Sequence, residues 1–241
     1  MFRIDEVQKD IFRINYFDGK YPVGFSQFLI RDEVPTLIHT GIWQEYEGIR
    51  GQIKKVLDPA TLRYIVIPHF EADECGGMDR FLAEAPGAKL MCSDTGAKIN
   101  LSGWNAPPPH TVWQDDVLEL GRHRLRFLMT PHVHHWDSMM VFEETEGVLF
   151  PADLFIQPGD VPPTSTEDMS GAMIQLYRTV GIMPSEDAVR RVLDRMDRLP
   201  IRHVNPMHGS CIPAAGLTPY VRALREQPFA YNGTVFGRSL F

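Results

Sequence analysis

The sequence predicts a mixed α/β fold in which sheets are covered by helices on their outer faces. Apolar, β-branched runs alternate along the chain with segments of helical spacing. No low-complexity linker or repeat divides the 241 residues, a length that suits one large α/β domain or two small ones. Hydrophobic residues make up 44% of the chain, enough for a substantial core. We therefore expect a single domain over residues 1–241.

The N-terminal half begins with mixed-charge, strand-like residues and continues with clear strand and helix patterns. The apolar, β-branched run 62–68 is typical of a strand that is buried on both faces. The helical spacing that begins at Glu45 stops before Asp58-Pro59, because proline does not continue a helix. The elements predicted after the N-terminus are strands 25–30 and 35–41 joined by the charged turn 31–33, helix 45–57, strand 62–68, helix 76–84 and strand 88–93.

The C-terminal half is predicted to contain two hairpins followed by helices. Ser165 or Thr166 is a candidate N-cap for the first long helix, and Ser185, followed by two acidic residues, is a candidate for the second. The predicted elements are strands 117–120 and 124–131, strands 138–144 and 148–155 around the turn 145–147, helices 167–180 and 185–199, strand 201–206 and helix 217–226.

Charge and composition exclude several classes of protein. The formal net charge is -7 and no dense run of lysine and arginine is present, which argues against nucleic acid and anionic membranes as partners. No apolar run approaches membrane-spanning length, and the N-terminus has no signal-peptide pattern. Three cysteines are a sparse, odd set, which we interpret as reduced thiols in a cytoplasmic protein.

The stretch Pro68–Gly77, PHFEADECGG, crowds metal-binding side chains directly after a buried strand. It contains His69, Glu71, Asp73 and Glu74. Like charges this close repel, so the carboxylates either point apart into water or surround a positive ion. In an extended strand His69 and Asp73 would lie roughly 13 Å apart, so a shared metal pair requires the segment to curl. Two glycines just beyond it permit the curl.

Other candidate ligands also fall where a predicted strand gives way to a loop. Residues 130–139 contain His132, His134 and His135, Asp153 follows Pro-Ala, and His208 precedes a glycine. Strand ends are held rigidly by the sheet and commonly carry catalytic groups. The three histidines of the loop cannot all bind one metal, so we expect two of them to line the pocket or to make outer hydrogen bonds.

The ordered set of these motifs resembles the metallo-β-lactamase fold in its di-iron branch, which contains the flavodiiron proteins and the shorter oxygen-binding di-iron proteins. The resemblance covers most of the chain and implies a four-layer αββα sandwich. The hydrolytic branch usually has a histidine where Glu71 stands. The ligand set that the resemblance implies is His69, Glu71 and His134 on the first iron, Asp153 as the bridge, and Asp73 and His208 on the second iron.

Two positions depart from the family pattern. The family continues with a histidine after Asp73, where this chain has Glu74, so Glu74 either binds the second metal or faces solvent. If it is ionised beside Glu71, Asp73 and Asp153, two divalent ions give a neutral site, and Glu74 would lower the reduction potential. The family often has Phe-His-Gly near the N-terminus, where this chain has Phe-Asp-Gly, so Asp18 would replace a histidine over the metals. Asp18 and Glu74 are our candidate catalytic residues.

The resemblance implies a protein that binds or reduces O2, NO or peroxide at two iron ions. No flavodoxin domain follows in this sequence, so an external electron donor would be required for turnover. Whether the chain is an oxidoreductase or an oxygen-binding or sensing protein stays open, as does a homodimer. The alternative is a Zn or Mn hydrolase of the same fold, acting on a lactone, thioester or phosphoester. A third alternative is a metal-poor relative that keeps a binding role.

Several histidines and cysteines are assigned no chemistry. We expect structural or surface roles for His39, His110, His123 and His203, of which His39 ends a strand nearest the predicted site. Cys75 adjoins the ligands, but packing is the expected role of its side chain.

Overall fold

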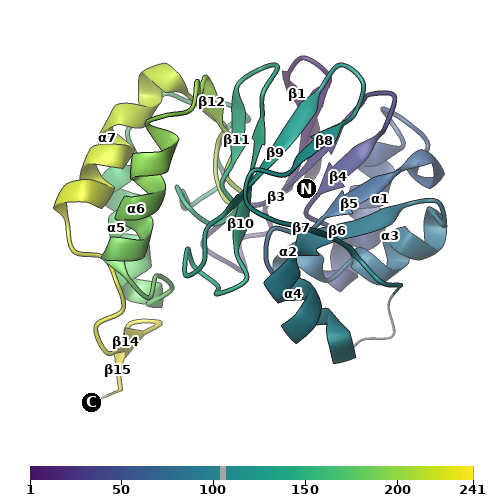
Figure 1. Ribbon diagram of the computed structural model, residues 1–241. Coiled ribbons are helices and arrows are strands. Elements are labelled where there is room, and N and C mark those ends of the chain that lie inside the picture. The colour runs from purple at the N-terminus through teal and green to yellow at the C-terminus, as the bar shows by residue number, and fades with distance from the viewer. Residues whose placement is uncertain (104–106, 241) are drawn as a thin grey trace.

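The computed structural model describes residues 1–103 and 107–240, and two large sheets stand at its centre (Figure 1). In spatial order, the first sheet contains β1 (Phe2–Gln8), β2 (Ile11–Tyr16), β3 (Phe25–Ile30), β4 (Thr36–Ile38), β5 (Tyr64–Val66), β6 (Lys89–Ser93) and β7 (His110–Val112). The second contains β13 (Ile212–Pro213), β12 (His203–Val204), β11 (Val148–Phe150), β10 (Met139–Glu143), β9 (Arg124–Met129) and β8 (Val117–Glu119). A small hairpin of β14 (Thr234–Val235) and β15 (Arg238–Ser239) lies near the C-terminus.

Helices cover the outer face of each sheet, so the architecture is the predicted αββα sandwich. Figure 1 shows α1 and α3 on one side of the paired sheets and α5, α6 and α7 on the other. The helices are α1 (Tyr46–Ile53), α2 (Ala72–Cys75), α3 (Met78–Glu84), α4 (Asp94–Ile99), α5 (Ser170–Val180), α6 (Glu186–Met196) and α7 (Ala214–Glu226), with short 3₁₀ turns at 43–45, 59–61 and 101–103.

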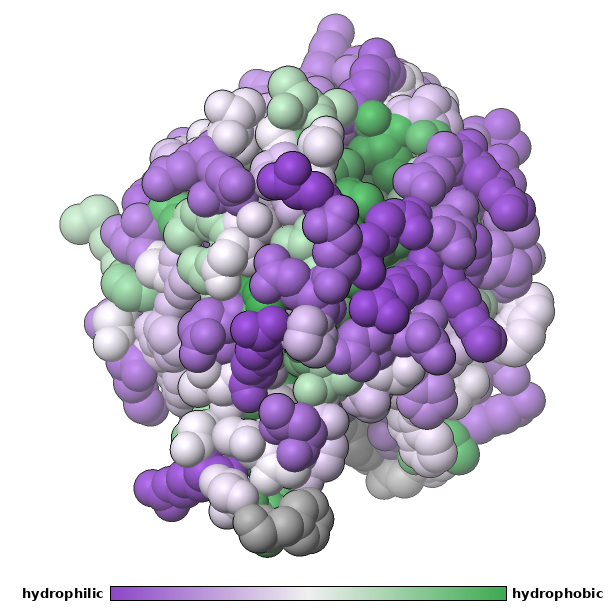
Figure 2. Space-filling model, turned by 90° about the vertical axis from the view of Figure 1, so that its left-hand side faces the viewer, coloured by the Kyte–Doolittle hydropathy of each residue, from purple (hydrophilic) through white to green (hydrophobic). Residues whose placement is uncertain are grey.

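Alternating side chains along the strands produce three apolar layers. In β5, Ile65 faces the α1 and α3 side, whereas Val66 packs into the cluster between the two sheets. In β9, Phe127 joins that same inter-sheet cluster, whereas Leu128 faces α5–α7. This period of two is the strand period, and it confirms that the central strands are buried on both faces. The outer surface over the α5–α7 layer is mostly hydrophilic (Figure 2).

Parallel pairing brings several chain segments to one edge of the first sheet. β4, β5 and β6 run parallel to one another, so the residues that follow them emerge together. His39 follows β4, and the Pro68–Gly77 stretch follows β5. On the second sheet, β11 and β12 are also parallel, and Asp153 and His208 follow them. The fold therefore supplies a common edge for the predicted ligands.

The stretch after β5 curls as predicted, although its glycines act differently from the expectation. Residues 72–75 form α2, which replaces an extended path with one helical turn. Gly76 and Gly77 keep ordinary negative φ angles of -62° and -88°. A Cβ at Gly76 would lie 2.4 Å from the carbonyl oxygen of Ala72, and one at Gly77 would lie 2.8 Å from that of Thr40. Close packing, not backbone freedom, requires these two glycines.

Three predicted boundaries are wrong for local reasons. The strand expected over 148–155 ends at Phe150, because Pro151 offers no N–H and Ala152 adopts a left-handed φ of 51°. The helix expected from 167 begins at Ser170, because the side chains of Ser165 and Asp168 bond the N–H groups of Glu167 and Ser170 in turns of their own. The strand expected over 201–206 shortens to β12, whose pairing covers two residues.

The remaining predicted elements appear near their expected places. The strands at 25–30 and 88–93, both hairpins, the helix within 45–57 and the helix within 185–199 are confirmed. β7, β13, β14, β15 and α4 were not expected from the sequence. No helix of the described residues has both the length and the apolar character needed to cross a membrane.

Ser185 is the N-cap of α6, and its hydroxyl oxygen accepts a hydrogen bond from the N–H of Ala188 at 3.3 Å. We expect Ser185→Ala to lower the free energy of unfolding by about 1 kcal/mol, because the backbone N–H of Ala188 loses its hydrogen-bond partner at the start of α6. Urea denaturation measures the change. Thr166→Ala is the matched control, since Thr166 is exposed and precedes α5, and an equal loss in both variants would contradict the capping role.

Candidate metal centre

Six predicted ligands meet at the shared edge of the two sheets. The first sheet supplies three of them from the segment after β5, and the second sheet supplies the other three from the β9–β10 loop and from the residues after β11 and β12. They are His69, Glu71, Asp73, His134, Asp153 and His208. The sequence prediction that these side chains lie together is consistent with this geometry.

Asp153 lies between two groups of ligands and is only 2% exposed. Its Oδ2 lies 2.9 Å from Nε2 of His134 and 3.5 Å from Nε2 of His69. Its Oδ1 lies 3.3 Å from Nε2 of His208. One carboxylate therefore presents a different oxygen to each group, which is the arrangement that a bridging ligand requires.

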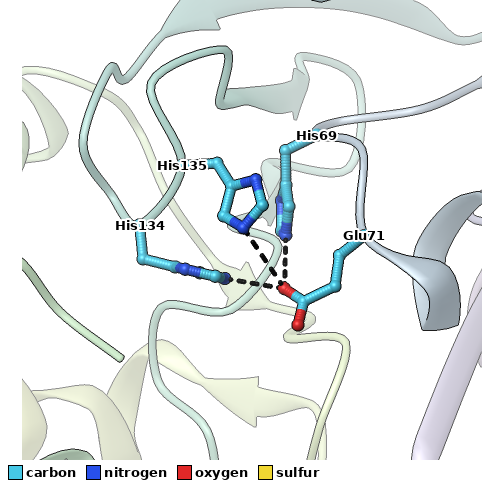
Figure 3. A group of neighbouring side chains, drawn as sticks. All are labelled: His69, Glu71, His134 and His135. Atoms are coloured by element: carbon cyan, nitrogen blue, oxygen red, sulfur yellow. Dashed lines mark ion pairs between the residues drawn. The ribbon is translucent and has the colours of Figure 1, made fainter. Parts of the chain in front are cut away.

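The first group surrounds one oxygen of Glu71 (Figure 3). Oε2 of Glu71 lies 3.1 Å from Nε2 of His134, 3.5 Å from Nε2 of His69 and 3.7 Å from Nε2 of His135. Ligand atoms of these four residues all lie within 4.8 Å of one another. His135 thus points at the site, as one of the two extra histidines was expected to do.

The second group consists of Asp73 and His208 with the other oxygen of Asp153. Oδ2 of Asp73 lies 3.3 Å from Nε2 of His208. Nδ1 of His208 lies 2.8 Å from the carbonyl oxygen of Gly24, to which it can only donate. This bond fixes a proton on Nδ1, so Nε2 is the nitrogen that faces the two carboxylates and would be available to a metal ion.

Glu74 is completely buried behind His69, so the alternative in which it faces solvent is wrong. Its Oε2 lies 3.2 Å from Nδ1 of His69, 3.3 Å from Nδ1 of His39 and 3.3 Å from the backbone N of His69. The carbonyl of Glu74 accepts two hydrogen bonds from Thr40, which hold α2 against the segment after β4. A carboxylate in contact with Nδ1 leaves Nε2 of His69 free to face Glu71 and Asp153.

The ligand alternative for Glu74 stays a prediction. Ligand atoms of His69, Glu74 and Asp153 lie within 4.8 Å of one another, and Oε1 of Glu74 has no hydrogen-bond partner among the described residues. His39 joins this arrangement, with a side chain that is fully buried against Glu74. His39 lies beside Glu74 because β4 pairs in parallel with β5. The sequence of a single strand does not show which strand it pairs with, so this position could not be predicted.

Asp18 lies at the surface of the loop after β2, and its place over the metals stays a prediction. Gly19 adopts a left-handed φ of 77°, and the exposed Asp18 carboxylate accepts the N–H of Lys20 at 2.8 Å, so the side chain folds back on its own turn. From the same loop, Tyr21 packs edge-on against Phe25 at 5.6 Å between ring centroids. Phe25 in turn packs edge-on against His208 at 5.2 Å. Tyr21 and Phe25 therefore cover the His208 side of the site.

His132 does not line the ligand pocket, as the sequence analysis expected for the further histidines of this loop. Its backbone φ is 66°, its side chain is exposed, and it lines a groove beside α6 instead of the ligand cluster. Of the four histidines expected to be structural, His123 is buried with Nδ1 at 3.1 Å from Glu143, far along the sheet from the ligands.

The carboxylates of the site hold protons on the neighbouring imidazoles when no metal neutralises them. Burial alone would raise the pKa of Asp153, but hydrogen bonds from three histidines, led by His134, hold it well below its usual range. Hydrogen bonds from His134 and His69 lower the pKa of Glu71 to about 2. Burial acts to lower the pKa of His134, but its bonds to Asp153 and Glu71 outweigh this and raise it to about 9.

Comparison with known proteins identifies the family of this chain. The family model described as "ODP family beta lactamase" matches residues 23–209. The Flavo-diiron protein FprA2 of Clostridium acetobutylicum is 26% identical over 208 residues, which are 82% of this chain and 52% of the relative. The Rubredoxin-oxygen oxidoreductase of Megalodesulfovibrio gigas is 31% identical over 141 residues, 56% of this chain and 35% of the relative. The chain thus spans about half the length of these curated relatives, or less.

Solved structures show the same fold. A flavodiiron protein from Giardia intestinalis superimposes with a TM-score of 0.83 at 17% identity, covering 92% of this chain and 58% of that one. A fragment of a diflavin flavoprotein from Nostoc sp. PCC 7120 gives 0.81 at 14% identity, covering 93% and 94%. The predicted metallo-β-lactamase-like sandwich is confirmed.

The stability of metal-free protein should depend on pH through these pairs. Because the pKa of His134 is raised from 6.5 to about 9, its contribution is complete below pH 6.5 and is lost as the pH rises through about 9. We expect the thermal unfolding midpoint of chelator-treated protein to fall across that interval. His134→Ala should flatten this part of the profile, whereas replacement of the exposed His110 by alanine should not. A profile that rises between pH 6.5 and 9 would contradict the pairing.

Proposed function

This chain belongs to the ODP beta lactamase family, and we propose that its edge site holds two iron ions that bind or reduce O2, NO or peroxide with electrons from an external donor. The observation that carries the proposal is the position of the Asp153 carboxylate between the two groups of ligands. A buried carboxylate that faces His69 and His134 with one oxygen and His208 with the other suits a bridge between two cations. Without cations, burial of the carboxylates of Glu74 and Asp153 so close together is costly.

The donor set fits iron. It consists of imidazole nitrogens and carboxylate oxygens, a mixture that suits Fe or Mn better than a thiolate set would. Cys75 lies beside the ligands, but burial raises the pKa of its thiol to about 12, so it stays protonated and packs in the core. Glu71, Asp73, Glu74 and Asp153 together carry four negative charges when ionised, which two divalent ions neutralise. The chain therefore offers both the ligands and the charge for a metal pair.

Each residue has a distinct task in this proposal. His69, Glu71 and His134 would hold the first ion, Asp73 and His208 the second, and Asp153 both. Glu74 orients His69 through Nδ1, and the carbonyl of Gly24 orients His208 in the same way. A reduced iron pair held there would supply electrons and open coordination positions for a small molecule.

Surrounding side chains would protect such a site from bulk water. Phe25 and Ile156 are buried beside the ligands, and Tyr21 stands over Phe25 at the surface. Glu71, Asp73 and His208 meet the adjoining cavity, and Glu71 is the most exposed of them, with 41% of its side chain accessible. Access from this one side would admit small molecules while His69 and Asp153 stay enclosed. The relative named as a rubredoxin-oxygen oxidoreductase supports a small oxygen-containing substrate.

Metal analysis tests the proposal. Protein purified without added metal should contain about two irons per chain, and the anaerobically reduced protein should develop a new absorption band on exposure to O2. Asp153→Ala should lose most of the bound iron, because neither ion keeps its shared ligand. Asp18→Asn is the matched carboxylate control and should keep both ions, because Asp18 bonds only its own turn. Two zinc ions and no band would instead indicate the hydrolase alternative.

Glu74 should tune the reduction potential of the metal pair. Removal of its negative charge disfavours the oxidised, more positive state of the pair, so Glu74→Gln should raise the midpoint potential while keeping the shape of the side chain. Redox titration followed by absorption measures the shift. Glu143→Gln is a matched control, since Glu143 is equally buried but pairs with His123 away from the site. A lowered or unchanged potential in Glu74→Gln would contradict this role.

A further inference from the structure

We propose that the cavity beside Asp73 and His208 binds an organic molecule with an uncharged, apolar body and an oxygen-donor head, the head reaching the metal pair proposed above. The apolar body would bind whether or not metals are present, whereas the contact of the head rests on the proposed function. The ligand is identified by the size, lining and charge of the cavity.

The cavity is larger than a diatomic gas requires. Its volume is about 360 Å³. A water molecule occupies about 30 Å³ in the liquid, and O2 or NO is of similar size. The space would therefore hold about ten such molecules, and it falls within the range of roughly 300–1,000 Å³ that small-molecule sites occupy. An organic molecule fills this volume, and a gas does not.

The lining divides into an apolar wall and a polar end. The wall combines residues from the N-terminal loop and from the α5 side, among them Val23, Ile156, Leu176 and Ile182. The polar end consists of Glu71, Asp73 and His208, which are all members of the ligand set. An apolar wall with a few convergent polar groups is typical of sites that orient an organic molecule by one end.

Charge defines the head of the molecule. Among the described residues that line the cavity there is no lysine or arginine. The fixed charges at its polar end are the carboxylates of Glu71 and Asp73, and the imidazole of His208 already faces Asp73 and Asp153, so an anionic group finds no unpaired protein cation there. Metal ions on these carboxylates would provide the missing positive charge, and oxygen donors are the natural ligands of such ions. The body lies against uncharged side chains and must be uncharged itself.

Aromatic side chains stand at the mouth of the cavity. Tyr21 is 42% exposed and Phe236 is 73% exposed, although both line it. Phe236 is carried by the β14–β15 hairpin, which is joined to the end of α5 by a hydrogen bond from the N–H of Gly237 to the carbonyl of Thr179 at 2.8 Å. Large apolar rings held at the rim of a cavity would be covered by a bound apolar body, which removes their surface from water.

Two alkyl hydroxamates test the inference on metal-loaded protein. Acetohydroxamate and octanohydroxamate share an oxygen-donor head and differ only in the length of the apolar chain. Optical titration should give octanohydroxamate a Kd at least about thirtyfold lower, because several methylene groups leave water. Leu176→Gln should reduce that ratio about tenfold without changing the Kd of acetohydroxamate. Ala172→Gln, at an exposed position of the same helix, is the control and should change neither.

Metal-free protein provides a second, independent measurement. The uncharged dye N-phenyl-1-naphthylamine should bind to it with enhanced fluorescence, and Phe236→Ser should weaken this binding at least about fivefold. Because Phe236 is largely exposed, this variant keeps the core intact even if Leu176→Gln misfolds. Equal Kd values for the two hydroxamates, or dye binding that both variants leave unchanged, would overturn the inference. Dye binding to a chain that takes up no iron would sustain the apolar site while the proposed function fails.

Discussion

The buried carboxylate of Asp153 is the group on which the arrangement of the whole edge depends. An ionised carboxylate away from water is stable only when positive or hydrogen-donating groups surround it. Here His69, His134 and His208 approach it from different chain segments, at 3.5, 2.9 and 3.3 Å from its oxygens. The hydroxyl of Tyr177 on α5 also donates to the backbone carbonyl of Asp153 at 2.9 Å. A single turn after β11 is thus fixed by both sheets and by the helical layer.

This dependence explains why two sheets are needed to make one site. The first sheet supplies the segment with His69, Glu71 and Asp73, and the second supplies the remaining ligands. The apolar cluster between the sheets, which includes Phe28 and Phe150 in aromatic contact at 5.1 Å, sets their relative position. Because interiors are close-packed, a shift of one sheet against the other would separate the two halves of the ligand set. Packing of this core therefore maintains the distances between the ligands of the site.

The sequence predicts the strands and the ligand order well because both are local signals. The apolar composition of a run such as residues 62–68 predicts a buried strand. The order and spacing of His69, Glu71 and Asp73 are properties of the sequence alone and do not depend on how the chain packs. The burial of Glu74 and His39 is not local, because it arises from the parallel pairing of β4 with β5. The orientation of Asp18 is not a local signal of the motif either. Its carboxylate accepts the N–H of Lys20 within its own turn, and a motif comparison does not reveal that turn.

The cavity and the ligand cluster meet on one helix, and this limits how independently they can behave. On α5, Leu176 lines the cavity, and the next residue, Tyr177, holds the turn of Asp153. The same hydroxyl accepts the N–H of Phe155 at 2.9 Å, so α5 is bonded to Asp153 and to the residues that directly follow it. Displacement of α5 by a molecule in the cavity would act on these bonds directly, because Tyr177, which makes them, is the neighbour of Leu176 in the same helix. The apolar wall of the cavity and the backbone at Asp153 are therefore joined through the hydroxyl of Tyr177.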